Sequence, residues 1–256
     1  MANERLRGAI TAKLLTVPQV AERLGVDPKT AERWITRERV PHRAHRVAAA
    51  ELLGVDEVYL WPATARDPRT VSAGQAELLG FFPSRSSVPA DLWRSLVVEA
   101  RESIDLLVYA GLFFPEMTDV GLLVDRARAG CRVRLLFGDP TGQAVALRGQ
   151  EEGFGIGVAH RVALSLRYFE NAVKAPGIEL RLHDTTLYAS IYRSDENLLA
   201  NVHLYGSPAA QNPVLHLRRV PGGRVVDQYL ASFDRVWAGA RRITDVTEVI
   251  TSVSGR

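Results

Sequence analysis

The sequence predicts two folded parts, an all-α amino-terminal domain and an α/β domain with a mixed sheet. Closely spaced helix signals fill the first quarter of the chain, and apolar strands alternating with helices fill most of the rest. Between the two parts prolines recur and long apolar runs are lacking. Because such elements pack into separate layers, we expect a helical domain at 1–62, a linker at 63–89, an α/β domain at 90–245 and a tail at 246–256.

The composition is typical of a soluble globular protein, with 46% apolar and 24% charged residues among 256. Its one cysteine, Cys131, lies in an apolar run, which favours a core position and excludes an internal disulfide. The sequence has no run of the roughly 18 apolar residues that span a bilayer, so we expect a cytoplasmic protein. The sequence predicts no cofactor and no metal, since its histidines do not form close-spaced ligand pairs on one element.

Two short helices are predicted near the start of the chain. Thr16 is a suitable N-cap, Pro18 follows in the first turn, and Gly25 can take the positive φ that ends a helix. Asp27 then caps a second helix, whose apolar face is formed by Ala31, Trp34 and Ile35. Two short helices joined by a turn with glycine are typical of the helix-turn-helix unit, whose second helix enters the major groove.

Positive charge is concentrated in this part of the chain, although the net charge of the whole protein is only +3. Six basic residues stand against Glu32 and Glu38 in one segment: Lys29, Arg33, Arg37, Arg39, Arg43 and Arg46. A local basic patch is the electrostatic footprint of a protein that contacts DNA phosphates. A solvated basic helix face, or a helical hairpin that binds no DNA, is the alternative interpretation.

The residues from Thr16 to Trp34 resemble the XRE (lambda-repressor-like) helix-turn-helix of bacterial regulators, and Leu60-Trp-Pro ends the domain as in its actinobacterial branch. Arg-Val-Pro-His-Arg at 39–43 and Ala-Ala-Ala-Glu-Leu-Leu-Gly-Val at 48–55 resemble the closing helices of such domains. The resemblance implies a phosphate contact by Gln19 and base-edge contacts by Lys29, Thr30 and Arg33. It places Arg37, Arg39 and Arg43 along the DNA backbone.

From residue 90 the pattern predicts helices over 91–103, 120–129, 158–174 and 225–240, and strands over 104–110 and 132–137. The segment before it is expected to be a semi-rigid linker, interrupted at most by a short strand or turn at 78–82. Parallel strands in such a pattern place ligands at the loops after their carboxyl ends, which makes Gly111, Gly138 and Asp139 candidate pocket residues. The apolar stripe of the last helix is core or dimer interface.

Four further strands are predicted over 178–183, 187–193, 198–205 and 214–218, and their polar side chains alternate with apolar ones. An antiparallel sheet with one face in water would show the same pattern. The prevalence of His, Tyr, Asn and Arg nevertheless favours a polar ligand pocket. Its candidate residues are His183, Tyr188, Ser190, Arg193, Asn201, His203, Tyr205, His216 and Arg218.

These strands and the units before them resemble a phospholipase-D-like domain, whose chemistry depends on His-x-Lys-x-x-x-x-Asp followed by Gly-Ser-x-Asn. In the best register Asp195 matches the aspartate, but Tyr188 replaces the histidine and Ser190 the lysine. The Gly-Ser-x-Asn segment has no clean match. Without that imidazole the covalent mechanism of the family cannot proceed, so the resemblance implies a pocket without catalysis.

The sequence therefore predicts a homodimeric, non-enzymatic transcriptional regulator that binds operator DNA. Its phospholipase-D-like domain would sense a ligand, anionic or nucleotide-like given the arginines and histidines, or mediate dimerisation. Two alternatives stay open: a phosphodiesterase or nuclease delivered to DNA, and a module that docks a partner regulator. Neither the operator nor the sign of regulation follows from the sequence.

Overall fold

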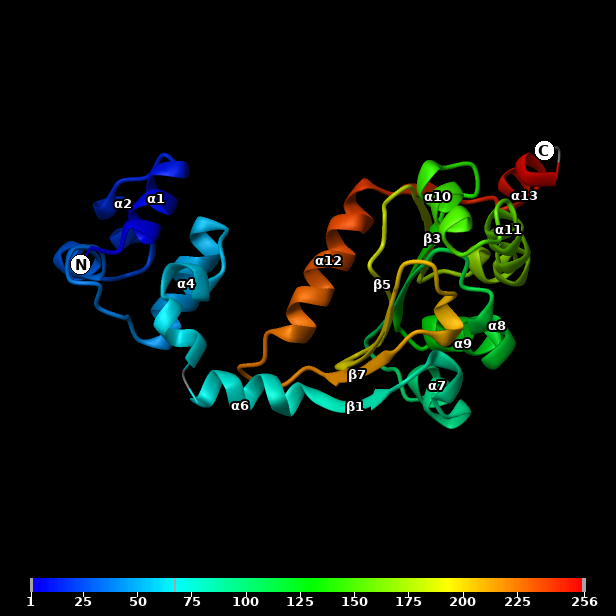
Figure 1. The fold of residues 1–256 in the computed structure, drawn as a ribbon, viewed down its shortest axis with the longest axis horizontal. Helices are drawn as coiled ribbons and strands as arrows, with labels where there is room; N and C mark the ends of the chain where they lie inside the picture. Colours follow the sequence, from blue (N-terminus) through cyan, green and yellow to red (C-terminus); the bar gives the residue numbers. More distant parts are fainter. Residues whose placement is uncertain (1, 67, 255–256) are drawn as a thin grey trace. The chain divides into compact units, whose positions relative to one another are not determined.

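The computed structural model describes residues 2–66 and 68–254, and the chain divides into two compact units, 1–72 and 73–256. The first unit is entirely helical and the second contains one sheet with helices on both faces (Figure 1). This confirms the predicted fold class, an all-α part followed by an α/β part. Among the described residues, no helix is long and apolar enough to cross a membrane.

The amino-terminal unit follows the local signals of its sequence. It contains α1 (Glu4–Ala12), α2 (Val17–Arg23), α3 (Pro28–Thr36), α4 (Arg43–Leu53), α5 (Glu57–Leu60) and a 3-10 turn at Pro62–Arg66. Thr16 and Gln19 form a reciprocal capping box at the start of α2, and the Asp27 side chain accepts from the Lys29 N–H at the start of α3. Gly25 takes the expected left-handed conformation, with φ of 64°. The helix-turn-helix prediction is therefore confirmed in its geometry.

Trp34 lies in the core of this unit, as its spacing predicts, and is 3% exposed. Its indole ring contacts Trp61 edge-on, with 6.5 Å between ring centroids. Further buried side chains come from every helix: Leu6, Ile10, Ala21, Ala31, Ile35, Leu53 and Leu60. This core fixes which face of α3 is turned outward.

The carboxy-terminal unit is built on a mixed eight-stranded sheet in the order β1-β7-β6-β5-β2-β3-β4-β8. Its strands are β1 (Leu78–Phe82), β2 (Ser103–Val108), β3 (Arg132–Gly138), β4 (Ile178–His183), β5 (Ala189–Ser194), β6 (Asn197–Val202), β7 (Val214–Arg218) and β8 (Arg241–Ile243). β2, β3 and β4 are parallel, while the other neighbours are antiparallel. Among these, β2 is buried along its whole length, as expected for a parallel strand covered on both faces.

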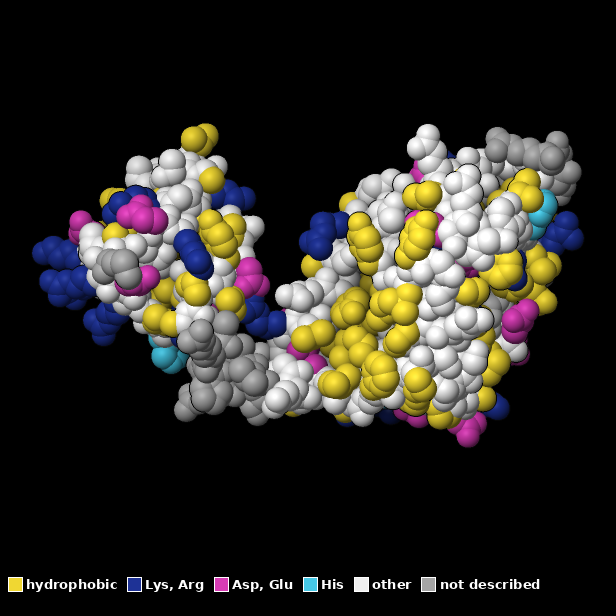
Figure 2. Space-filling view, viewed as in Figure 1, with side chains coloured by type: hydrophobic (Ala, Val, Ile, Leu, Met, Phe, Trp, Pro, Cys, Tyr) yellow, Lys and Arg dark blue, Asp and Glu magenta, His cyan; other side chains and the backbone are white. Residues whose placement is uncertain are grey.

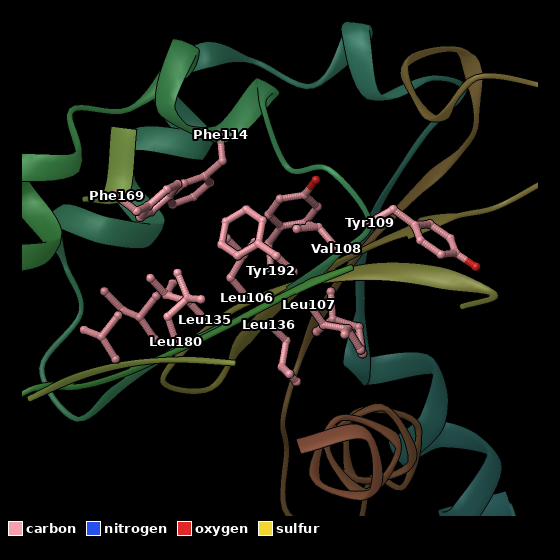
Figure 3. Packing of buried hydrophobic residues seen from close by; sticks show 14 of the residues in the cluster. Leu106, Leu107, Val108, Tyr109, Phe114, Leu135, Leu136, Phe169, Leu180 and Tyr192 are labelled. Atoms are coloured by element: carbon pink, nitrogen blue, oxygen red, sulfur yellow. The ribbon is translucent and has the colours of Figure 1, made fainter. Parts of the chain in front are cut away.

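Helices cover the two faces of the sheet unequally. α12 (Val225–Gly239) lies on one face (Figure 1). The other carries α7 (Ala90–Val98), α8 (Phe113–Met117), α9 (Val120–Arg128), α10 (Gln143–Glu151) and α11 (Gly157–Phe169), as well as α13 (Thr247–Ser254), which packs on α11. In Figure 3, Leu136 points toward the side of α12, whereas Phe114 and Phe169 lie on the opposite side. Each face thus has its own apolar layer.

The expected linker and tail are shorter in the structure than the sequence suggests. The short strand expected at 78–82 is confirmed as β1, which pairs with β7, but α6 (Pro68–Glu77) lies before it where only a linker was expected. The expected tail contains α13, whose Val249, Ile250 and Val253 are buried in the core. Both corrections have one cause, since these segments are ordered by contacts with parts of the chain that are distant in sequence.

Several element boundaries also differ from the prediction. The helix expected at 91–103 ends at Val98, and β2 begins at Ser103. In the turn between α7 and β2, the backbone N–H groups of Arg101, Glu102 and Ser103 donate to the Asp195 carboxylate, each at 2.9 Å. This carboxylate therefore supplies the acceptors for the turn. Likewise α11 ends at Phe169 rather than 174, and β6 ends at Val202 rather than 205.

Candidate nucleic-acid interface and ligand cavity

The outward face of α3 carries the residues predicted to read DNA bases. Lys29 and Arg33 are exposed, and Thr30 is half-buried beside them. They lie opposite the buried Trp34 and Ile35, so the core of the unit leaves them accessible. A recognition helix requires this arrangement, in which N-terminal side chains project away from the helical core.

Arg37, Arg39 and Arg43 are exposed around the end of α3 and the start of α4, as expected for phosphate contacts. Gln19 is exposed at the start of α2, where its Oε1 accepts from the Thr16 N–H at 2.9 Å. That bond holds the carbonyl end of the side chain in a helix cap.

One member of the basic segment has a structural role instead. Arg46 is largely buried, forms an ion pair with Glu57, and donates to the Pro41 carbonyl at 3.1 Å. Its charge is neutralised inside the unit, so it adds little to the patch. The basic surface is accordingly formed by the exposed arginines of α3 and α4 and by Lys29.

In the second unit, Ser190 and His203 form the centre of a small cavity. Ser190 Oγ lies 3.0 Å from His203 Nε2, and His203 Nδ1 lies 3.2 Å from the Leu187 carbonyl oxygen. A carbonyl oxygen can only accept, so Nδ1 carries the proton and Nε2 accepts from the Ser190 hydroxyl. The Tyr109 ring stacks on the imidazole, with 5.5 Å between centroids.

Three arginines surround this pair in a cavity of about 120 Å³, against one acidic lining residue, Glu152. Arg148 is 4% exposed and donates to the carbonyl oxygen of Ser207 at 3.0 Å. Its guanidinium pairs with Glu152 at 2.6 Å, yet its buried Nε has no hydrogen-bond partner among the described residues. Arg85 and Arg161 stack on aromatic rings and form no ion pair within the described part of the chain. We call this the His203 cavity.

The cavity keeps its histidine neutral. Burial, followed by the nearby charge of Arg148, lowers the pKa of His203 to about 4. At neutral pH the imidazole is therefore an uncharged acceptor next to cationic guanidinium groups. The positive charge of the cavity comes from the arginines alone.

This shift predicts a pH dependence of stability. In the unfolded chain His203 binds a proton near pH 6.5, whereas in the folded protein it does so only near pH 4. The unfolding free energy should therefore fall as pH drops from about 6.5 to 4, by at most about 3 kcal/mol from this residue. Urea unfolding at pH 7 and pH 4.5 measures the difference, which should be smaller in His203→Gln. Equal pH slopes in both proteins would contradict the assignment.

Only part of the predicted polar pocket is brought together. Ser190 and His203 meet in the cavity, but Tyr188 and Tyr205 are 81% and 87% exposed beyond it. Arg218 is exposed on the surface, and the Nε2 of the half-buried His216 has no hydrogen-bond partner among the described residues.

Three other predicted ligand residues have structural partners, so their inclusion in one pocket is wrong. Arg193 lies on the α12 face and pairs with Asp105 at 2.7 Å. Asn201 is fully buried and donates to the carbonyl oxygens of Asn212 and Pro213. His183 Nε2 lies 3.0 Å from the Val108 carbonyl oxygen, and burial lowers the pKa of this histidine. The alternation pattern identified polar positions but not their partners.

Tyr109 and Arg148, which reach the cavity from other elements, were not predicted from the sequence. Of the three residues expected at the strand ends, Gly111 lines the cavity, with φ of 64°. Asp139 instead accepts a hydrogen bond from Arg241, and a Cβ at Gly138 would clash with Val145. No local signal marks Arg148, because α10 also carries Gln143, Gln150 and Glu151. No group of three or more His, Cys, Asp or Glu that would hold a metal occurs among residues 2–66 and 68–254.

Similar solved structures share little sequence with this chain. The structure of TrmBL2, described as an archaeal chromatin protein with a novel mode of DNA binding, has 13% identity and a TM-score of 0.41 over 85% of this chain and 72% of that chain. A phospholipase D family member, Nuc from Salmonella typhimurium, has 17% identity and a TM-score of 0.37 over 64% and 95%. Phosphatidylserine synthase from Haemophilus influenzae Rd KW20 has 16% identity and a TM-score of 0.42 over 66% and 40%.

Two sequence families match the chain, and no curated protein does. Residues 14–54 match a helix-turn-helix domain, which agrees with the geometry of α2 and α3. Residues 75–244 match a domain of unknown function, DUF5919, and this match begins near the boundary between the two units. Since the second match covers more than half of the sequence, the chain belongs to the DUF5919 family and carries a helix-turn-helix domain before the domain that defines it.

Proposed function

We infer that the protein is a DNA-binding transcriptional regulator whose carboxy-terminal unit senses a small anionic ligand. The helix-turn-helix domain, taken as XRE-type of the actinobacterial branch, would bind operator DNA as a homodimer. One such domain reads few base pairs, and a two-fold operator doubles the contacts. The observation that carries the sensor part is the His203 cavity, where three arginines exceed the two glutamates paired with Arg148 and the Nε of Arg148 is unpaired among the described residues.

DNA binding is tested on α3 with an operator selected from random duplexes. Arg33→Ala should weaken binding to that operator by about 5- to 150-fold and relax its base preference, because Arg33 faces a base edge in this proposal. Fluorescence anisotropy with the selected and scrambled duplexes measures both effects. Arg7→Ala, on α1 outside the motif, is the matched control and should change neither. Unchanged affinity in Arg33→Ala would contradict the proposed orientation.

The phosphate-facing arginines should behave differently. Arg37→Ala and Arg43→Ala should weaken selected and scrambled duplexes equally, because phosphate contacts carry no direct base information. Each loss should also reduce the slope of log affinity against log salt by about one. Titrations at several salt concentrations measure that slope. A sequence-dependent effect of either variant would place these arginines at the bases instead.

Ligand sensing is tested by thermal shift with inorganic phosphate and a panel of mononucleotides. A binding anion at one hundred times its Kd should stabilise the folded state by about 2.7 kcal/mol. Arg161→Gln should reduce that shift, whereas Arg167→Gln, exposed on the same helix but outside the cavity, should preserve it. To regulate, the same anion must also change operator affinity, since a ligand acts only through a difference between two states. No stabilisation across the panel would favour the partner-docking alternative.

The enzyme alternative has one supporting observation, the hydrogen bond between Ser190 and His203. Against it, an imidazole with a pKa of about 4 is a weak general base at neutral pH. In addition, the Asp195 carboxylate is engaged by three backbone N–H groups. We therefore expect no hydrolysis of bis(p-nitrophenyl) phosphate by the purified protein. Turnover that His203→Ala abolishes would overturn the non-enzymatic proposal.

A further inference from the structure

A second and larger hollow lies on the opposite face of the sheet from the His203 cavity. It measures about 570 Å³, within the usual size of small-molecule sites. Its floor is formed by side chains of β2 and β5 such as Leu107 and Ile191, and one wall is α12. Figure 2 shows hydrophobic side chains gathered over this region of the carboxy-terminal unit. We call it the α12 cleft.

Side-chain contacts hold α12, one wall of the cleft, over the neighbouring strands β3 and β4. The Phe233 ring lies on the guanidinium of Arg134 on β3, with 4.5 Å from Cζ to the ring centroid. The Trp237 ring lies on that of Arg181 on β4, at 4.3 Å. Arg134 also pairs with Asp234 of α12 at 2.8 Å. These contacts hold the helix over β3 and β4. The half-buried Ala189 of β5 and Val236 of α12 then face the cleft, while Leu107 and Ile191 are buried beneath it.

The lining indicates the chemistry of an occupant. Its apolar floor is joined by polar groups of α12, including Gln228 and Ser232, and none of its described lining residues is acidic. The single charged lining residue, Arg235, is exposed and forms no ion pair with any described residue. The acids of α12 are engaged elsewhere, Asp234 with Arg134 and Asp227 with Arg219. An apolar surface next to one uncompensated guanidinium complements an apolar molecule that carries one anionic group.

We propose that the α12 cleft binds an amphipathic monoanion, such as a medium-chain or aromatic carboxylate. The hydrocarbon part lies on the half-buried Ala189, Tyr229 and Val236, where its burial supplies most of the affinity. The carboxylate lies at Arg235, at the solvent end of the contact. This site is separate from the His203 cavity and does not depend on DNA binding by the first unit.

Sodium decanoate below its micelle concentration is the probe, with decanol as the neutral analogue, and isothermal titration calorimetry of the full chain is the measurement. Decanoate should bind to the wild-type protein. Arg235→Gln should weaken decanoate affinity about threefold, as expected for an exposed ion pair, and should leave decanol affinity unchanged. Arg167→Gln, which changes another exposed arginine, on α11, is the matched control and should bind decanoate normally. Equal decanoate affinity in all three proteins would overturn the role of Arg235.

Two variants fill the cleft from opposite sides. Ala189→Trp fills the cleft from its floor and Ser232→Trp fills it from α12. Each should weaken decanoate affinity at least tenfold, and thermal melting shows whether the variant is folded. Decanoate that still binds to whichever variant is folded would overturn the site. Sedimentation of the unliganded variants tests a different occupant. If both convert a wild-type dimer to a monomer and decanoate does not bind the wild type, the cleft is an interface between copies and the proposal fails.

Discussion

Asp105→Asn is expected to lower the free energy of unfolding of the carboxy-terminal unit by about 3–5 kcal/mol. Asp105 lies inside the sheet on β2 and is 1% exposed. Its carboxylate accepts two hydrogen bonds from Arg134, at 2.7 and 2.9 Å, and one from Arg193 at 2.7 Å. An amide would leave the largely buried guanidinium of Arg193 without its carboxylate and Arg134 with only the exposed Asp234.

Asp234→Asn is the matched control, because Asp234 pairs with the same Arg134 but its side chain is 61% exposed. Water and salt screen that pair, so its loss should cost less than about 1 kcal/mol. Urea denaturation of the three proteins measures both values. Similar losses of unfolding free energy in the two variants would show that burial does not strengthen the ion pairs of Asp105.

The second large effect is expected from Glu77→Gln at the junction between α6 and α12. The Glu77 side chain is fully buried and accepts from the first N–H groups of α12, those of Arg224, Val225 and Val226, at 2.8, 2.8 and 3.0 Å. A glutamine would direct an N–H₂ group at one or two of these donors and remove the charge that faces the positive end of the helix. We expect a loss of about 2–4 kcal/mol in unfolding free energy.

Asp119→Ala is the control for this variant, because Asp119 caps α9 through one exposed hydrogen bond to the Gly121 N–H. Its loss should cost about 1 kcal/mol. Far-ultraviolet circular dichroism during urea unfolding gives both values. If Glu77→Gln costs no more than Asp119→Ala, the buried carboxylate is not an important anchor of α12.

The helix-turn-helix domain could be predicted because its determinants are local. Thr16, Asp27 and Gly25 act within a few residues, and the spacing of Trp34 and Ile35 alone selects the buried face of α3. The outward side chains then follow from the geometry of a helix. Arg46 was misassigned to the basic surface because Glu57, its partner, lies on another helix.

The cavity could be predicted only in part, because its residues converge from distant elements. Period-2 alternation correctly selected Ser190 and His203 as polar positions. It could not tell that Arg193 lies on the other face with Asp105, since that contact depends on the pairing of β5 with β2. Arg148 reaches the cavity from α10, and no local pattern places that helix beside the loop after β6. The pairing of strands distant in sequence carries this information.

The pairing of β1 with β7 has a consequence for synthesis of the chain. Ribosomes synthesise the chain from its amino terminus. The segment Leu78-Leu-Gly-Phe-Phe therefore emerges long before the strand at 214–218, to which it hydrogen-bonds. Leu79 and Phe81 are more than half exposed even in the finished sheet. A nascent or truncated chain that ends before β7 would present an unpaired apolar strand, the kind of segment that nucleates aggregation. The helical unit that precedes it has its own core, so β1 is the segment that must wait for a distant partner.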